Sequence, residues 1–230
     1  MRVLALDTAT EACSVALLHD GRVSGLFEEV GRGHAERILS MVDAVLGEAG
    51  ISVPSLDGIA ASVGPGSFTG VRICVSVAQG LAYGANIPVV AVTTLEALAL
   101  QATARGATQV LACLDARMGE VYWSCFRGMT ACSSPSVGPA ASVRLPFAGS
   151  VQGIGRGFAA YPELATLPGL ELATGAAQAL PDARDMVGLG AQKLLAGEGI
   201  DAAELLPRYL RDKVAFTEAE RASRKSPQQA

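Results

Sequence analysis

Short apolar runs separated by polar turns dominate the beginning of the chain. Residues 3–6 are uniformly apolar and end at Asp7, which is typical of a buried strand. Residues 13–17 alternate between larger and smaller side chains and predict a second strand, and the Asp20-Gly21 pair that follows suits a tight hairpin turn. Three more strands are predicted at residues 23–30, 59–63 and 88–92.

The hydrophobic period changes to that of a helix after these first strands. In residues 34–49 the apolar side chains recur every three or four positions, with charged side chains elsewhere. Residues 68–83 form a second helical segment, and Thr93 or Thr94 can cap a third. The order β-β-β-α-β-α-β-α predicts an α/β lobe at residues 1–106, in which helices cover a mixed sheet.

The second half of the chain repeats the beginning of the first. Residues 111–115 again form an apolar run that ends in aspartate before a small polar turn, and residues 121–126 predict the next strand. We expect residues 107–204 to form a second lobe on the same plan, reduced because its pattern degrades into loops rich in Ser, Pro and Gly. Residues 205–216 can rejoin the first lobe, and residues 217–230 are predicted to be a polar tail.

Composition restricts the function more than it restricts the fold. The chain has 230 residues, 50% of them hydrophobic, and its net charge is −4. An acidic globular protein lacks the basic surplus that holds nucleic acid, so the chain is not expected to bind nucleic acid by itself. Its five cysteines are odd in number and show no CxxC spacing, which favours reduced thiols. No signal peptide or membrane-spanning stretch is visible, so we expect a cytoplasmic protein that contacts no membrane.

The turn after the first strand contains Asp7, Thr8 and Thr10. An aspartate at this position could hold a metal–nucleotide complex through water, and the threonine hydroxyls could touch phosphate. The same side chains could equally satisfy the backbone of the turn. The local sequence leaves both interpretations open.

A glycine-rich turn precedes the second predicted helix. Gly64, Gly66 and Ser67 leave backbone N–H groups free before a helix, which is the geometry of an anion site. Because neither a Walker loop nor a dinucleotide fingerprint is present, we favour a sharp turn with close helix packing. Gly153 and Gly155 form a second cluster where a nucleotide could approach the backbone, although such clusters are more often ordinary loops.

Five stretches carry a resemblance to a known family. They are LALDTAT at the start, GPGSFTGVRI, PVVAVTTLEALA, LDARMGEVY and PRYLRDKVA near the end. Together they extend over nearly the whole chain, which resembles the TsaB (YeaZ) family of tRNA threonylcarbamoyladenosine biosynthesis. The resemblance implies a two-lobed fold of the actin–Hsp70–sugar kinase (ASKHA) type.

The resemblance also implies a role. TsaB-like proteins pair with a TsaD-like paralogue that transfers a threonylcarbamoyl group to N6 of adenosine 37 in tRNA, and a small TsaE-like ATPase joins them. Two histidines on one helix of the paralogue bind its catalytic metal, whereas here Thr94 and Leu98 stand at the similar positions, and neither is a competent transition-metal ligand. The implied protein is a non-catalytic partner or activator without catalytic or metal-binding residues. It would meet tRNA only through the complex and leave ATP or ADP and metal to the partner subunits.

The resemblance further implies that the two first-lobe helices form the pairing surface. A charge at Val42 or Val75 should then abolish pairing and leave the monomer folded, unless both apolar stripes belong to the chain's own core. An exposed apolar helix pair also favours a homodimer when the partner is missing. The expected interface residues are His34, Arg37, Ile38, Met41, Val42, Val45, Phe68, Val71, Arg72 and Val75.

Two other functions compete with this one. The first is an active ASKHA-fold transferase or kinase that uses ATP through Asp7, Thr8, Ser67 and the loop at Gly153. The second is a metallopeptidase. It is the least favoured, because the sequence shows neither a metal-ligand constellation nor a nucleophile–base pair.

Overall fold

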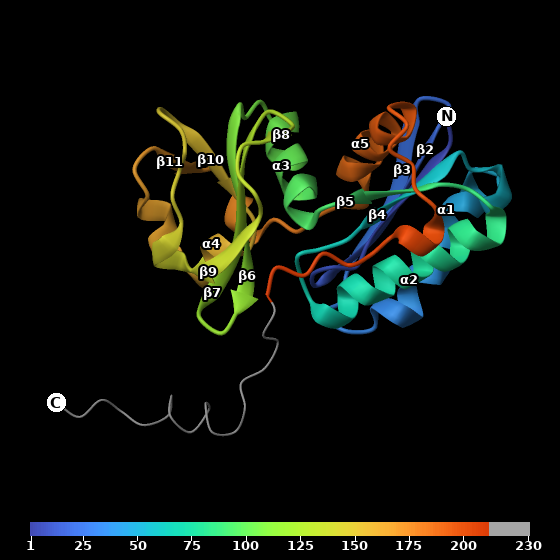
Figure 1. Ribbon diagram of the computed structural model, residues 1–230, viewed down its shortest axis with the longest axis horizontal. Coiled ribbons are helices and arrows are strands. Elements are labelled where there is room, and N and C mark those ends of the chain that lie inside the picture. The colour runs from blue at the N-terminus through green and yellow to red at the C-terminus, as the bar shows by residue number, and fades with distance from the viewer. Residues whose placement is uncertain (212–230) are drawn as a thin grey trace, which may run out of the picture.

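A computed structural model describes residues 1–211, which form two lobes, each built on its own β-sheet (Figure 1). In the first sheet the strand order is β3-β2-β1-β4-β5. Strand β1 pairs antiparallel with β2 and parallel with β4, so the predicted mixed sheet is confirmed. The strands are β1 (Val3–Asp7), β2 (Ala12–His19), β3 (Arg22–Glu29), β4 (Gly58–Ser62) and β5 (Val89–Val92).

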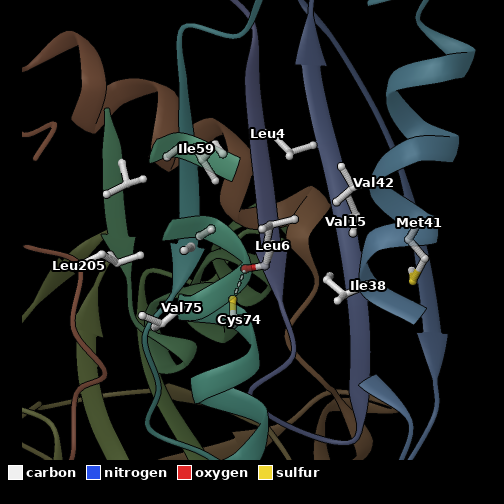
Figure 2. Close-up of a cluster of buried hydrophobic side chains, with 14 of the residues drawn as sticks. Leu4, Leu6, Val15, Ile38, Met41, Val42, Ile59, Cys74, Val75 and Leu205 are labelled. Atoms are coloured by element: carbon white, nitrogen blue, oxygen red, sulfur yellow. Dashed lines mark hydrogen bonds between the residues drawn. The ribbon is translucent and has the colours of Figure 1, made fainter. Parts of the chain in front are cut away.

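Helices cover both faces of the first sheet. Helices α1 (His34–Glu48) and α2 (Phe68–Ala85) pack on one face, and α5 (Ala183–Leu195) packs on the other. Residues of β1 alternate between the two faces of the sheet. Leu4 and Leu6 join the cluster under α1 and α2 (Figure 2), whereas Val3 and Ala5 join the cluster under α5. Within residues 1–211, no helix combines the length and the apolar character needed to cross a bilayer.

The second lobe repeats the plan of the first, as the sequence echo predicts. Strand β6 takes the place of β1, because it pairs antiparallel with β7 and parallel with β10. The lobe is reduced in its helices rather than in its strands: α3 (Thr94–Ala104) packs on β6, and α4 (Gly157–Ala160) is a single turn. Its strands are β6 (Gln109–Arg117), β7 (Glu120–Arg127), β8 (Thr130–Ala131), β9 (Ser136–Pro139), β10 (Val151–Ile154) and β11 (Leu170–Leu172).

Short 3-10 turns complete the connections between these elements. Their bounds are η1 (Val53–Ser55), η2 (Ala140–Ser142), η3 (Pro162–Thr166), η4 (Ala176–Gln178) and η5 (Ala202–Glu204).

The division of the chain between the lobes differs from the predicted boundaries. Helix α5 lies inside the predicted second lobe, residues 107–204, yet it packs on the first sheet, where a Cβ at Gly190 would lie 2.4 Å from the Ala60 Cβ. Helix α3 lies inside the predicted first lobe, yet most of its buried side chains join the core of the second. The predicted boundaries followed the order of residues along the chain, whereas α3 and α5 each pack on the sheet of the other lobe.

Residues 205–211 pack against the first lobe. Leu205 is fully buried under α2, and its carbonyl accepts a hydrogen bond from Gln79 Nε2 at 3.0 Å. The Arg208 N–H donates to the Val63 carbonyl at 2.8 Å. The remaining residues of the predicted return, 212–216, and the predicted polar tail at 217–230 lie outside the described residues.

Gly70 lets α2 approach the first strand closely. A Cβ added to Gly70 would lie 2.1 Å from the Thr8 carbonyl oxygen, whereas one added to Gly80, in the same helix, would meet nothing within 4 Å. Substitutions at the two glycines can therefore distinguish the effect of close packing, at Gly70, from the effect of helix propensity, at Gly80.

We predict that Gly70→Ala destabilises the protein by about 2 kcal/mol or more, because the backbone must shift to admit the methyl group. Gly80→Ala is the matched control and should be neutral or stabilising, by up to about 1 kcal/mol from helix propensity. Urea unfolding of the two variants measures the difference. Equal midpoints for both would contradict a close contact at Gly70.

Candidate functional site

The turn after β1 packs directly against the glycine-rich loop before α2. Thr8 Oγ1 donates to the Gly70 carbonyl at 2.7 Å, and the Ser67 N–H donates to the Ala9 carbonyl at 2.7 Å. A Cβ at Gly66 would lie 2.1 Å from that same carbonyl oxygen. The turn's own backbone therefore occupies the space beside Gly66, which agrees with the packing interpretation of this loop.

Asp7 and Thr8 are completely buried, with no exposed surface. Asp7 Oδ1 accepts a hydrogen bond from the Ala9 N–H at 2.9 Å, while Oδ2 is buried without a partner among residues 1–211. The nearby Ser62 hydroxyl bonds instead to Thr94 Oγ1 at 3.1 Å. Desolvation raises the pKa of Asp7 to about 6, although the Ser62 hydroxyl and the Ala9 N–H act in the opposite direction.

The other residues predicted near this turn have structural partners as well. The Thr10 carbonyl accepts a hydrogen bond from His34 Nε2 at 2.8 Å, so His34 fastens the start of α1 to the turn. Ser67 is exposed and caps α2 through its side chain, which accepts the Gly70 N–H. Gly64 has a φ of 93°, and its carbonyl accepts the Thr94 N–H at 3.0 Å.

The second glycine cluster is packed inside the second lobe. A Cβ at Gly153 would lie 2.7 Å from side-chain atoms of both Leu172 and Phe158. At Gly155, whose φ is 108°, it would lie 2.3 Å from the Cys113 carbonyl oxygen. Close packing around β10 accounts for both glycines.

Charged side chains join the two lobes at the turn after β1. Glu11, in this turn, pairs with Arg117 at 3.1 Å and with Arg156 at 3.6 Å, both from the second lobe. Arg156 also pairs with Glu29 of β3 at 2.7 Å, and Arg117 pairs with Asp115 at 2.8 Å. These ion pairs connect the turn after β1 and strand β3 to the second lobe.

The structure corrects most of the predicted pairing surface. Six of the ten residues are at most 3% exposed and belong to the core under the first sheet: Ile38, Met41, Val42, Val45, Val71 and Val75. Figure 2 labels four of them, Ile38, Met41, Val42 and Val75. His34 is also buried. The expectation that a charge at Val42 or Val75 leaves the monomer folded is therefore wrong, because that charge would enter the core.

Three predicted interface residues do reach the surface. Arg37 bonds to Glu28 of β3, with Nε 2.9 Å from Oε2. Phe68 is 42% exposed, and the Arg72 guanidinium lies 3.7 Å from the centre of its ring. Arg72 Nε also donates to the Tyr209 hydroxyl at 2.7 Å, so the returning segment extends this cluster.

The outer face of α1 and α2 carries two large side chains that are not among the ten expected interface residues. Leu39 on α1 is 50% exposed, and Tyr83 near the end of α2 is 79% exposed. Three small residues of α2 after Arg72 are also exposed: Ser76, Gly80 and Gly84. The helical period could have found Leu39, since it lies one position beyond the buried Ile38 and outside the inward stripe.

Thr94 and Leu98 are both completely buried. Thr94 begins α3 behind the Thr93 cap, and Leu98 packs into the core of the second lobe. Among residues 1–211, no group of three or more His, Cys, Asp and Glu side chains is placed to hold a metal ion.

Comparisons with known proteins agree with one another. A family model described as TsaD, tRNA N6-adenosine threonylcarbamoyltransferase, matches residues 27–142. The chain is 42% identical to the tRNA threonylcarbamoyladenosine biosynthesis protein TsaB of Escherichia coli (strain K12), over 94% of this chain and 97% of that protein. It is 37% identical to the Haemophilus influenzae protein of the same name, over 94% and 96%.

Solved structures give the same picture. YeaZ from Pseudomonas aeruginosa superposes with a TM-score of 0.85 at 43% identity, over 91% of this chain and 99% of that one. Component A of (R)-2-hydroxyglutaryl-CoA dehydratase from Acidaminococcus fermentans has a TM-score of 0.51 at 10% identity, over 85% and 99%, which is a likeness of fold alone. The predicted two-lobed ASKHA fold is confirmed.

We predict that Asp7→Asn stabilises the protein above about pH 6, by about 3 kcal/mol, since the pKa of Asp7 rises from 3.8 unfolded to about 6 folded. The folded carboxyl binds its proton more tightly than the unfolded one. Its contribution to stability is therefore complete below about pH 3.8 and is lost as pH rises through about 6.

Urea unfolding of the wild type and the Asn variant across this pH window measures the effect. The stability difference should grow as pH rises and then level off. A difference that does not change with pH would contradict a buried, ionising Asp7.

Proposed function

This chain belongs to the TsaB family of tRNA threonylcarbamoyladenosine biosynthesis proteins, and from that premise we propose that it is the non-catalytic partner of a TsaD-like transferase. In this role the chain holds and activates the subunit that threonylcarbamoylates N6 of adenosine 37 in tRNA. It contributes a binding surface rather than reacting groups.

The burial of Thr94 and Leu98 carries the proposal. These two residues stand where the TsaD-like paralogue is expected to hold its metal, and both are fully buried. Leu98 contacts apolar side chains of the second-lobe core, and the Thr94 hydroxyl bonds to Ser62 Oγ. An aliphatic side chain supplies no metal ligand, and a lone threonine hydroxyl is a poor one.

The state of the turn after β1 supports the same conclusion. A nucleotide needs exposed donors, yet Thr8 is buried with its hydroxyl bonded to Gly70, and the Asp7 carboxylate is closed off from solvent. Ser67 is exposed, but its side chain caps α2. We accordingly assign ATP or ADP and the metal to the partner subunits, with none bound firmly by this chain.

The pairing surface we propose is the outer face of α1 and α2. Leu39, Phe68 and Tyr83 supply exposed apolar area, and the small exposed residues of α2 would let another helix approach closely. Arg37 and Arg72 supply charges at its rim. The same face would allow a homodimer when the partner is absent.

We propose two further partners, tRNA and a small ATPase. A net charge of −4 gives it little affinity for phosphate, so tRNA is met only through the complex. A TsaE-like ATPase is the third member of the assembly we propose, located in the cytoplasm.

A catalytically active transferase is the second candidate. It is favoured by the match of residues 27–142 to a family model described as a threonylcarbamoyltransferase. The two candidates differ in what the isolated chain does: a transferase or kinase turns over ATP or modifies tRNA alone, and a partner protein does neither.

Reconstitution of tRNA modification with purified TsaD-like and TsaE-like proteins distinguishes them. We predict that modification requires this chain and that the chain alone neither transfers the group nor hydrolyses ATP. Modification at full rate without the chain would contradict the partner role. Turnover by the chain alone would establish the transferase instead.

Variants of the outer helix face test the pairing surface. Leu39→Asp should weaken binding to the TsaD-like protein at least tenfold while the monomer stays folded, because Leu39 is half exposed. Leu195→Asp is the matched control, since Leu195 is 77% exposed but lies on α5, on the opposite side of the first sheet. Val42→Asp should instead unfold the monomer.

Binding is measured by titration calorimetry and folding by circular dichroism. Equal losses of affinity in Leu39→Asp and Leu195→Asp would place the interface elsewhere. A folded Val42→Asp monomer would contradict the core that the structure assigns to α1.

A further inference from the structure

Two of the five cysteines face each other across a β-hairpin of the second lobe. Strand β7 turns back into β8 with Phe126 opposite Ala131 and Arg127 opposite Thr130. The next pair in this register is Cys125 and Cys132, and the Cys132 N–H donates to the Cys125 carbonyl at 2.8 Å. The two residues are therefore direct cross-strand partners, although they lie seven positions apart in sequence.

This register places the two thiols within reach of each other. Directly opposed residues on antiparallel strands project from the same face of the sheet. Only one of the two backbone bonds of a hydrogen-bonded pair is made here, because the Cys125 N–H donates to Ser133 Oγ. Opposed residues have Cα atoms about 4.5–5.5 Å apart, inside the range of about 4.4–6.8 Å that disulfides occupy. The Cβ atoms of opposed residues lie about 4.5–5.5 Å apart, so the two segments must move slightly together to reach the roughly 3.5–4.5 Å of a disulfide.

The two thiols differ in their access to solvent. Cys132 is exposed, whereas Cys125 is 1% exposed and its sulfur lies 3.9 Å from the Arg144 carbonyl oxygen. Burial raises the pKa of Cys125 to about 11, with Ser133 acting in the opposite direction. Cys132 is thus the thiol that a small oxidant meets first, and Cys125 is placed to react second.

We propose that Cys125 and Cys132 form an oxidation-sensitive thiol pair that closes to an intramolecular disulfide when the protein meets hydrogen peroxide. The Cys132 thiolate attacks one peroxide oxygen and becomes a sulfenic acid, and the other oxygen leaves as hydroxide and is protonated to water. Cys125 sulfur then attacks the Cys132 sulfur, the S–O bond breaks, and the departing hydroxide takes the Cys125 proton. Two thiols and one peroxide give one disulfide and two waters, and a thiol reductant reverses the change.

The disulfide would connect β7 to the segment that pairs along its outer side, which contains β8 and β9. Strand β7 pairs with β8 at one end and with β9 at the other, and residues 132–135 connect β8 to β9. At this connection the Cys125 N–H donates to Ser133 Oγ at 3.0 Å, and Ser124 Oγ donates to the Ser133 carbonyl at 2.9 Å. A covalent link here would hold this segment against β7.

Cys113 provides an internal control. It lies on β6 opposite Trp123, so it is offset by two positions from Cys125, whose partner is Leu111. Diagonal neighbours are about 7–8 Å apart at Cα, beyond the reach of an unstrained disulfide. Cys113 is also fully buried and has no direct access to oxidant.

Peptide mapping of the full chain tests the proposal. The reduced protein is exposed to hydrogen peroxide, alkylated, digested with trypsin and analysed by mass spectrometry without reduction. Because Arg127 separates the two cysteines, the bridge must join peptide 118–127 to peptide 128–144, and Cys113 lies in a third peptide. We expect this crosslinked pair from wild type and Cys113→Ser, its complete loss in Cys132→Ser and Cys125→Ala, and its removal by dithiothreitol.

Three results would overturn the proposal. One is oxidation of Cys132 to sulfinic acid without the crosslink, and another is a crosslink between two chains through Cys132. The third is a bridge from Cys132 to Cys113. Circular dichroism of each variant confirms that it is folded, and since Cys132 is exposed, Cys132→Ser keeps the test valid if Cys125→Ala fails to fold.

Discussion

Contact between two backbone segments determines the geometry of the first lobe. The carbonyls of Thr8 and Ala9, in the turn after β1, face Gly70 and Gly66 so closely that a Cβ at either glycine would lie 2.1 Å from an oxygen. Helix α2 can settle onto the sheet only because these positions lack side chains. The same contact closes the turn over Asp7, and it leaves a carboxyl oxygen buried without a partner in the described chain. The packing of α2, the burial of Asp7 and the loss of a free anion-binding loop therefore share one cause.

Much of this fold could be predicted from the chain, because its elements depend on local pattern. The hairpin at Asp20-Gly21 adopts positive φ at both residues, and Thr93 caps α3 with Glu96 in a capping box. The repeat of strand, aspartate and turn correctly indicated a second sheet with the same pairing as the first. What failed was the assignment of partners between distant elements, as with α5, since pattern shows that a helix has an apolar side but not which sheet covers it.

The same limit explains the outcome for the predicted interface. The apolar stripe of α1, including Ile38 and Val42, satisfies the criterion for a pairing surface and the criterion for a core equally well. Leu4 and Leu6 of the sheet pack against this stripe. The part of α1 that is still free to contact a partner is its outer side, where Leu39 is half exposed. A periodic pattern gives direction around a helix axis. Whether the neighbour in that direction is part of the same chain depends on tertiary structure.

Leu98 has a structural role in the core of the second lobe. A Cβ at Gly155 would lie 3.0 Å from Leu98 Cδ1, so this side chain helps to pack α3 against the loop after β10. Replacing it with histidine would bury an imidazole among apolar neighbours, and Thr94 would still provide no nitrogen ligand. A two-histidine site here would need substitutions at two buried positions, and both would disturb the packing of the core. Leu39 and Tyr83 on the outer helix face are exposed and take no part in this packing, so the proposed pairing surface does not depend on what occupies positions 94 and 98.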